Sequence, residues 1–268
     1  GRLSQSALRY AINLAASRFG EASWIANQLY GIAYYEQVKD WVHRWEDVEE
    51  SLFEGLSCLY EKVMRAFAGH LVLGCDQKMY GQLKSQRFHG LADLDFQIES
   101  LPWQGGWLPE VGESAYGRII ASPVAFVGQV LPSISYEHEA APHLGLAAGI
   151  LDHLVLHPKI REQGGAYGGG AVSNPMAANF YFYSYRDPQI EGTLEVFREG
   201  IDLLAAGEFE ESDLNEAKFE LIQSLDAPIS PGSRGEVAYS WWREGKSMAK
   251  RQAFREAVLR ASCQDIQI

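Results

Sequence analysis

The chain has 268 residues, of which 47% are hydrophobic and 22% charged, and this composition excludes disordered, collagen-like and coiled-coil proteins. It carries 35 acidic and 23 basic residues, a net charge of -12, with no cluster of Lys and Arg. Nucleic acids and anionic membranes attract basic surfaces, so we predict neither as a partner. The sequence also lacks the run of about 18 apolar residues that a membrane-spanning helix needs.

The cysteines and the chain ends bear on cellular context. Cys58, Cys75 and Cys263 are few and far apart, which fits neither a disulfide framework nor a zinc ribbon. We therefore predict a reducing compartment, the cytoplasm or an organelle matrix. The sequence starts at Gly1 in a helix-like pattern and reaches Ile268 without a polar tail, so we expect a piece of a longer polypeptide.

The first part of the chain is predicted to be mainly helical. Apolar residues recur at helical spacing from residue 3 to about residue 65, and Gly20 and Gly31 divide this stretch into three predicted helices. Residues 70–75 form a short apolar run closed by glycine, which predicts a buried strand. Residues 78–88 then return to a helical pattern.

A change in composition divides the chain into two predicted domains. Residues 100–115 are rich in Pro and Gly and contain two Trp, so we predict a linker that packs against the protein. It separates a helical and α+β domain at 1–99 from an α+β domain at 116–268. The predicted fold class is α+β, with antiparallel or mixed sheets and helices packed on one face.

The second domain combines predicted strands and helices. Pro158, or a residue shortly after it, should end the first of its helices. The predicted strands and helices are, in chain order, strands within 118–130, a helix at 143–157, a Gly-rich strand at 164–172, its hairpin partner at 179–186, and two helices that follow Pro188 and Ser212.

The most distinctive local pattern is the glycine-rich stretch that follows Arg161. Five glycines lie between Gly164 and Gly170, and because glycine weakens a strand, such a run marks a close approach of a ligand or another backbone, or else a flexible hairpin. The sequence leaves these two interpretations open. The spacing differs from that of phosphate-binding loops, so a nucleotide site is not predicted.

Arg161 and Tyr167 flank this stretch and could together stabilise a developing oxyanion, as a fixed cation and a hydroxyl donor. The alternative is ordinary: an Arg near a helix end that caps carbonyl groups, and a strand Tyr that packs. His153 and His157 stand at i and i+4, the spacing of metal ligands on a helix, but neither zinc-helix motif is completed around them.

Four blocks in one register resemble the C-terminal half of a known family, the presequence-protease branch of the pitrilysin/insulinase-type inverted zinc metallopeptidases. They are residues 157–171 (HPKIREQGGAYGGGA), 183–188 (YSYRDP), 215–218 (NEAK) and 226–231 (DAPISP). Residues 1 to about 110 resemble the preceding region of the same half less distinctly. The resemblance thus implies parts of the third and fourth family domains, the fourth continuing beyond Ile268.

The resemblance also implies a function. Family members are two-halved zinc peptidases whose N-terminal half holds zinc in an H-x-x-E-H motif, which this chain lacks. By match to the family motif, Arg161 and Tyr167 are catalytic, His157, Gly164 and Gly165 bind substrate, and no residue binds metal. The implied partners are the N-terminal half of the same polypeptide and short unstructured peptides, and the chain alone should be inactive.

Two alternatives stay open at this stage. A non-catalytic scaffold or assembly subunit would keep this fold while losing site residues, although the presence of both Arg161 and Tyr167 argues against it. A self-contained metalloenzyme would instead use His153 and His157 as its zinc ligands.

Overall fold

The computed structural model describes residues 5–65, 71–93, 105–106 and 115–267. The described residues separate into two compact units: one draws on Gly1–Glu36, Gly106–Ala227 and Met248–Ile268, the other on Gln37–Gly105 and Pro228–Ser247. The predicted linker at 100–115 falls mostly outside the described residues, so the division into domains at 1–99 and 116–268 stays a prediction.

A three-stranded antiparallel sheet forms the centre of the first unit. Its strands are β1 (Ala125–Pro132), β2 (Gly168–Asn174) and β3 (Asn179–Asp187), in the spatial order β1-β3-β2. Side chains alternate along β3, so that Phe180 and Phe182 enter the hydrophobic core while Tyr181 and Tyr183 lie on the other face. The predicted α+β class is confirmed, and the hairpin of β2 and β3 was predicted from its sequence.

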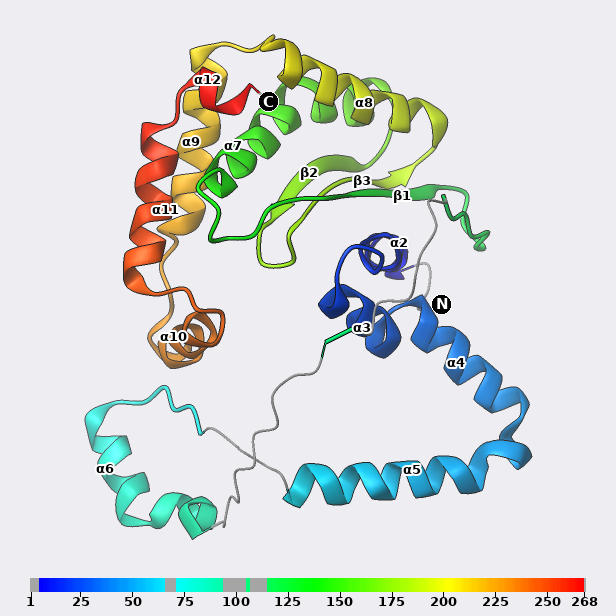
Figure 1. Ribbon diagram of the computed structural model, residues 1–268, viewed down its shortest axis with the longest axis vertical. Coiled ribbons are helices and arrows are strands. Elements are labelled where there is room, and N and C mark those ends of the chain that lie inside the picture. Colours follow the sequence, from blue (N-terminus) through cyan, green and yellow to red (C-terminus); the bar gives the residue numbers. More distant parts are fainter. Residues whose placement is uncertain (1–4, 66–70, 94–104, 107–114, 268) are drawn as a thin grey trace. The chain divides into compact units, whose positions relative to one another are not determined.

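Helices cover the core face of this sheet (Figure 1). Leu146, Ile150 and Phe197 are fully buried there. The opposite face receives an N-terminal helix, for which Gly128 of β1 makes room: a Cβ at Gly128 would lie 3.1 Å from Cγ1 of Ile12. The helices that follow β1 in this unit are α7 (Ala141–Leu151), the π-helix η2 (Asp152–Gln163), α8 (Glu191–Ala206), α9 (Glu211–Leu225), α11 (Met248–Arg260) and α12 (Cys263–Ile266).

The N-terminal helical stretch contains one more break than the sequence predicted. Both predicted glycine breaks occur, but a further one at Arg44 divides the third predicted helix in two. The helices over residues 7–65 are α2 (Ala7–Ala16), α3 (Glu21–Tyr30), α4 (Ile32–His43) and α5 (Trp45–Arg65). None of the described helices is both long and apolar enough to cross a membrane.

The strand predicted at 70–75 is wrong for its described part, since residues 71–76 have no regular secondary structure and Leu71 is 52% exposed. His70 lies outside the described residues. Short apolar runs fit several environments, and here Gly74 packs its backbone against Gly232 of the same unit. The other described helices of this second unit are α6 (Gln77–Ser85), η1 (Arg87–Asp93), η3 (Pro231–Ser233) and α10 (Arg234–Arg243).

Candidate functional site

The candidate site is built on a π-helix that continues α7 without a break. This helix, η2, carries His153, His157 and Arg161. It extends through Pro158 to Gln163, five residues beyond the proline at which, or shortly after which, it was predicted to end. In an α-helix the proline ring would clash with the carbonyl of residue 154. The wider turn of a π-helix, with its i→i+5 bonding, accommodates the ring, so the helix continues.

Two glycines after η2 reverse the direction of the chain, so that β2 runs back alongside the helix. The N–H of Gly164 donates to the carbonyl of Lys159 at 2.9 Å, and a Cβ at Gly164 would lie 2.6 Å from the carbonyl oxygen of Ile160. Gly165 has φ 79°, a left-handed conformation that favours glycine. The turn itself therefore requires both glycines, and their predicted role in binding substrate stays a prediction.

Arg161 and Tyr167 lie on opposite sides of this turn, and both side chains reach solvent. Arg161 is exposed, and Tyr167 is 70% exposed. The backbone N–H of Tyr167 donates to the carbonyl of Tyr185 at 3.1 Å, which attaches the start of β2 to β3. The two predicted donors thus come from a helix end and a strand start that one short turn connects.

His157 lies beside Arg161, in the turn of η2 before it. Nη1 of Arg161 is 2.9 Å from Nε2 of His157, and a guanidinium can only donate, so Nε2 is the acceptor and the ring proton lies on Nδ1. On its other side, Nδ1 of His157 is 3.7 Å from Oε1 of Glu162. The observed contact of His157 is therefore with Arg161, whereas its predicted contact with substrate stays a prediction.

His153 faces a different partner. Its Nε2 lies 3.1 Å from Oε2 of Glu220 on α9, and this carboxylate raises the pKa of the imidazole above its ordinary value. Glu220 thus occupies Nε2, one of the two ring nitrogens through which His153 could bind a metal. Within the described residues no three His, Cys, Asp or Glu side chains gather as metal ligands would. The residues in place around His153 and His157 therefore do not fit a zinc ion.

The structure adds one titratable group that the sequence analysis did not select, Asp152. Asp152 is the first residue of η2, and its carboxylate accepts the backbone N–H of Ala171 in β2 at 2.6 Å. Burial raises the pKa of Asp152 to about 6, against the lowering effect of the Ala171 N–H. The signal in the sequence was an acidic residue inside the apolar pattern between Leu151 and Val155.

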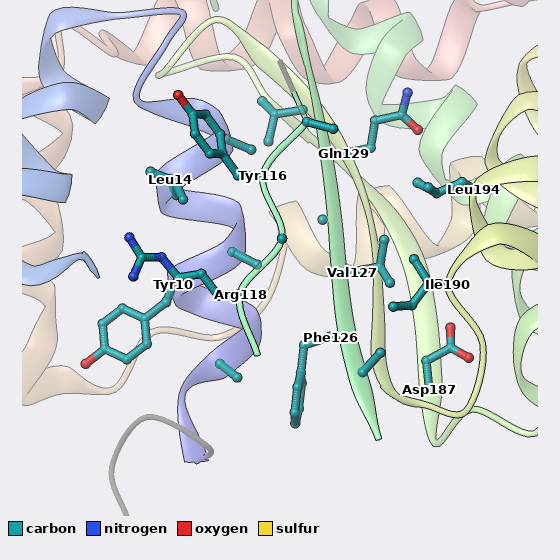
Figure 2. Close-up of a pocket in the computed structure, with 18 of the residues that line it drawn as sticks. Tyr10, Leu14, Tyr116, Arg118, Phe126, Val127, Gln129, Asp187, Ile190 and Leu194 are labelled. Carbon is teal, nitrogen blue, oxygen red and sulfur yellow. The ribbon is translucent and has the colours of Figure 1, made fainter. Parts of the chain in front are cut away.

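Aromatic rings run across the sheet from Tyr167. Its ring meets Tyr185 edge-on at 5.9 Å between centroids, and Tyr185 in turn meets Phe126 of β1 at 5.3 Å. Phe126 also lines a cavity of about 1130 Å³ that extends between α2, β1 and the start of α8 (Figure 2). Leu14, Val127 and Leu194 contribute to its largely apolar wall. The cavity therefore begins beyond Tyr185, on the β1 side of the sheet.

Comparisons with known proteins agree on one family. Residues 141–267 match the family model described as PreP C-terminal domain. The mitochondrial presequence protease of Eremothecium gossypii is 30% identical over 264 residues, which cover 93% of this chain and 26% of that protein. The mitochondrial presequence protease of Emericella nidulans is 28% identical, over a match that covers 96% of this chain and 25% of that protein. The chain thus spans about a quarter of the length of the curated relatives it matches.

Similarity to a solved structure supports the fold alone. The crystal structure of a protease from Helicobacter pylori matches with a TM-score of 0.50 at 14% sequence identity. The match covers 72% of this chain and 48% of that chain.

Proposed function

Because this chain belongs to the presequence-protease-like peptidases as part of their C-terminal half, we propose that it supplies Arg161 and Tyr167 to the cleavage of short unstructured peptides. In the full-length polypeptide these two side chains would form part of the chamber wall that faces the scissile bond. The relatives are named mitochondrial presequence proteases, so an organelle matrix is the proposed compartment.

The observation that carries this proposal is the pair of exposed donors on the two sides of the Gly164–Gly165 turn. When a peptide carbonyl is attacked, its oxygen gains negative charge, and donors held where that charge develops lower the barrier. Arg161 offers a permanent cation, and Tyr167 offers a phenolic hydroxyl. Both side chains are exposed and neither needs to leave a buried site to reach a substrate.

The zinc ion of such a peptidase is proposed to be held by the N-terminal half of the full-length polypeptide. The described residues of this chain bring no set of metal ligands together, and His157 instead accepts a hydrogen bond from Arg161. In this proposal the chain's own residues bind and orient the substrate and stabilise the oxyanion.

Steady-state kinetics of the full-length enzyme test this function. On an unstructured fluorogenic peptide, Arg161→Ala and Tyr167→Phe should each lower kcat by roughly 10²–10³, because an oxyanion donor acts in the transition state. KM should change little. Arg260→Ala, which removes an exposed Arg from α11, and Tyr181→Phe, which removes a hydroxyl from β3, are the matched controls. Unchanged kcat in both site variants would favour a non-catalytic scaffold.

A further inference from the structure

Asp152 is a largely buried carboxylate for which the proposed chemistry has no use. It lies at the start of η2, and its Oδ1 accepts the backbone N–H of Ala171 at 2.6 Å. Ala171 is 6% exposed and belongs to β2, which pairs within the described sheet with β3 alone. Its N–H points away from β3, so Asp152 provides the partner that a neighbouring strand would otherwise supply.

Two glycines of β2 allow η2 to lie this close. A Cβ at Gly170 would be 3.0 Å from Oδ1 of Asp152 and 3.1 Å from the hydroxyl oxygen of Tyr183. A Cβ at Gly169 would be 2.8 Å from Cγ2 of Ile160. Side chains at either position would push the helix off the strand. Part of the glycine run therefore serves the contact between η2 and β2.

These contacts join η2 and β2 at two places. The Gly164–Gly165 turn connects them at one end, and the hydrogen bond from Ala171 to Asp152 connects them near the other. Arg161 and Tyr167 project from the two arms close to the turn. Val155, Leu156 and Ile160 of η2 are buried in the core, and the Asp152 contact adds a polar connection between the start of the helix and β2.

We propose that Asp152 is a positioning residue, which holds η2 against β2 through the Ala171 amide and thereby fixes Arg161 relative to Tyr167. This inference rests on the proposed function of the two donors. A misplacement of about 1 Å in a catalytic group can cost about 10² in rate, so a small shift of η2 along β2 would weaken the oxyanion contact without altering the donors themselves.

Variants of Asp152 in the full-length enzyme test the proposal. Asp152→Ala leaves the buried Ala171 N–H without an acceptor and should lower kcat by up to about 10²-fold, the cost of misplacing a catalytic group by about 1 Å, while KM stays within about twofold. Asp152→Asn keeps a side-chain oxygen at this place and should recover most of kcat. Amide hydrogen exchange in residues 168–174 should accelerate in the alanine variant only.

Asp265→Ala is the control for a purely structural effect. Asp265 also accepts a backbone N–H, that of Ser262, at 2.8 Å, but it does so on α12, away from η2 and β2. The control should leave kcat and the exchange of residues 168–174 unchanged. If Asp265→Ala lowers kcat as much as Asp152→Ala, or if Asp152→Asn is as impaired as Asp152→Ala, the positioning role is wrong.

A double variant separates this inference from the proposed function. If Asp152 acts through Arg161, Asp152→Ala should lower kcat much less in an Arg161→Ala background than in the wild type. Equal factors in both backgrounds would overturn the positioning role. If Arg161→Ala alone leaves kcat unchanged, the proposed function itself is wrong. If Arg161→Ala lowers kcat and Asp152→Ala does not, only the role of Asp152 is wrong.

Discussion

Arg161 donates from Nη1 to Nε2 of His157, one turn before it on η2, across 2.9 Å. The contact holds the free end of a long, exposed side chain that would otherwise sample many rotamers. Because a guanidinium can only donate, Nε2 of His157 is the acceptor in this contact. His157 therefore restricts the position of the proposed oxyanion donor without contacting the oxyanion.

Removing this acceptor should weaken turnover. His157→Ala is expected to lower kcat of the full-length enzyme about three- to tenfold, less than a buried hydrogen bond to a charged group would cost, because water replaces the lost partner. His157→Gln places an amide oxygen near the position of Nε2 and should recover part of the loss. Initial rates at saturating peptide concentration measure kcat for both variants. A loss that appears only in KM would instead place His157 in direct contact with substrate.

The sequence predicted the hairpin and the placement of Arg161 and Tyr167 beside it because these depend on local signals. The alternation of residues in β3 indicates a strand of the hairpin, and the glycines after η2 indicate the turn between Arg161 and Tyr167. The π-helix could not be predicted, since α and π turns show similar apolar patterns over twelve residues. Asp152 was missed for a related reason: its partner, Ala171, is nineteen residues away and offers a backbone group, which leaves no mark in the sequence.

The turn after η2 should depend on glycine at position 165, whereas Gly168, the first residue of β2, should tolerate replacement. Gly165 has φ 79°, so Gly165→Ala is expected to lower the free energy of unfolding by about 1–2 kcal/mol through backbone strain. A Cβ there would meet Pro188 only at 3.6 Å, an ordinary contact. Gly168→Ala is the matched control, because nothing lies within 4 Å of its Cβ position and its φ is not positive. Urea unfolding of both variants measures the difference, and equal losses would contradict it.

The buried carboxylate of Asp152 should make stability depend on pH. Burial raises its pKa from 3.8 to about 6, against lowering by the Ala171 N–H and by His153, while Glu220 raises it. A carboxyl with a raised folded-state pKa stabilises the fold below pH 3.8, and this contribution is lost as the pH rises through about 6. Asp152→Asn cannot ionise. Relative to the wild type it should gain stability with rising pH, by up to about 3 kcal/mol above pH 6.

Urea unfolding at pH 4 and at pH 7.5 measures this dependence. Asp265→Asn is the control, because hydrogen bonding by the Ser262 N–H holds the pKa of Asp265 below its ordinary value. The stabilising contribution of Asp265 is present above pH 3.8 and is lost only below it, so its removal should shift the free energy of unfolding almost equally at both pH values. If Asp152→Asn also changes the free energy of unfolding by the same amount at pH 4 and at pH 7.5, the pKa of Asp152 is not raised in the folded state.

If the N-terminal half of the polypeptide holds the zinc, replacing the two histidines of η2 should not change the metal content. His153 pairs with Glu220 and His157 with Arg161, so His153→Ala and His157→Ala should leave the zinc stoichiometry of the full-length enzyme unchanged. This chain prepared alone should bind no zinc and should not cleave peptide, whereas mixing it with the remaining part of the polypeptide, the N-terminal half included, should restore turnover. Elemental analysis and a fluorogenic peptide assay measure both properties. Stoichiometric zinc in the chain alone, lost on His153→Ala, would instead identify a metal site on η2.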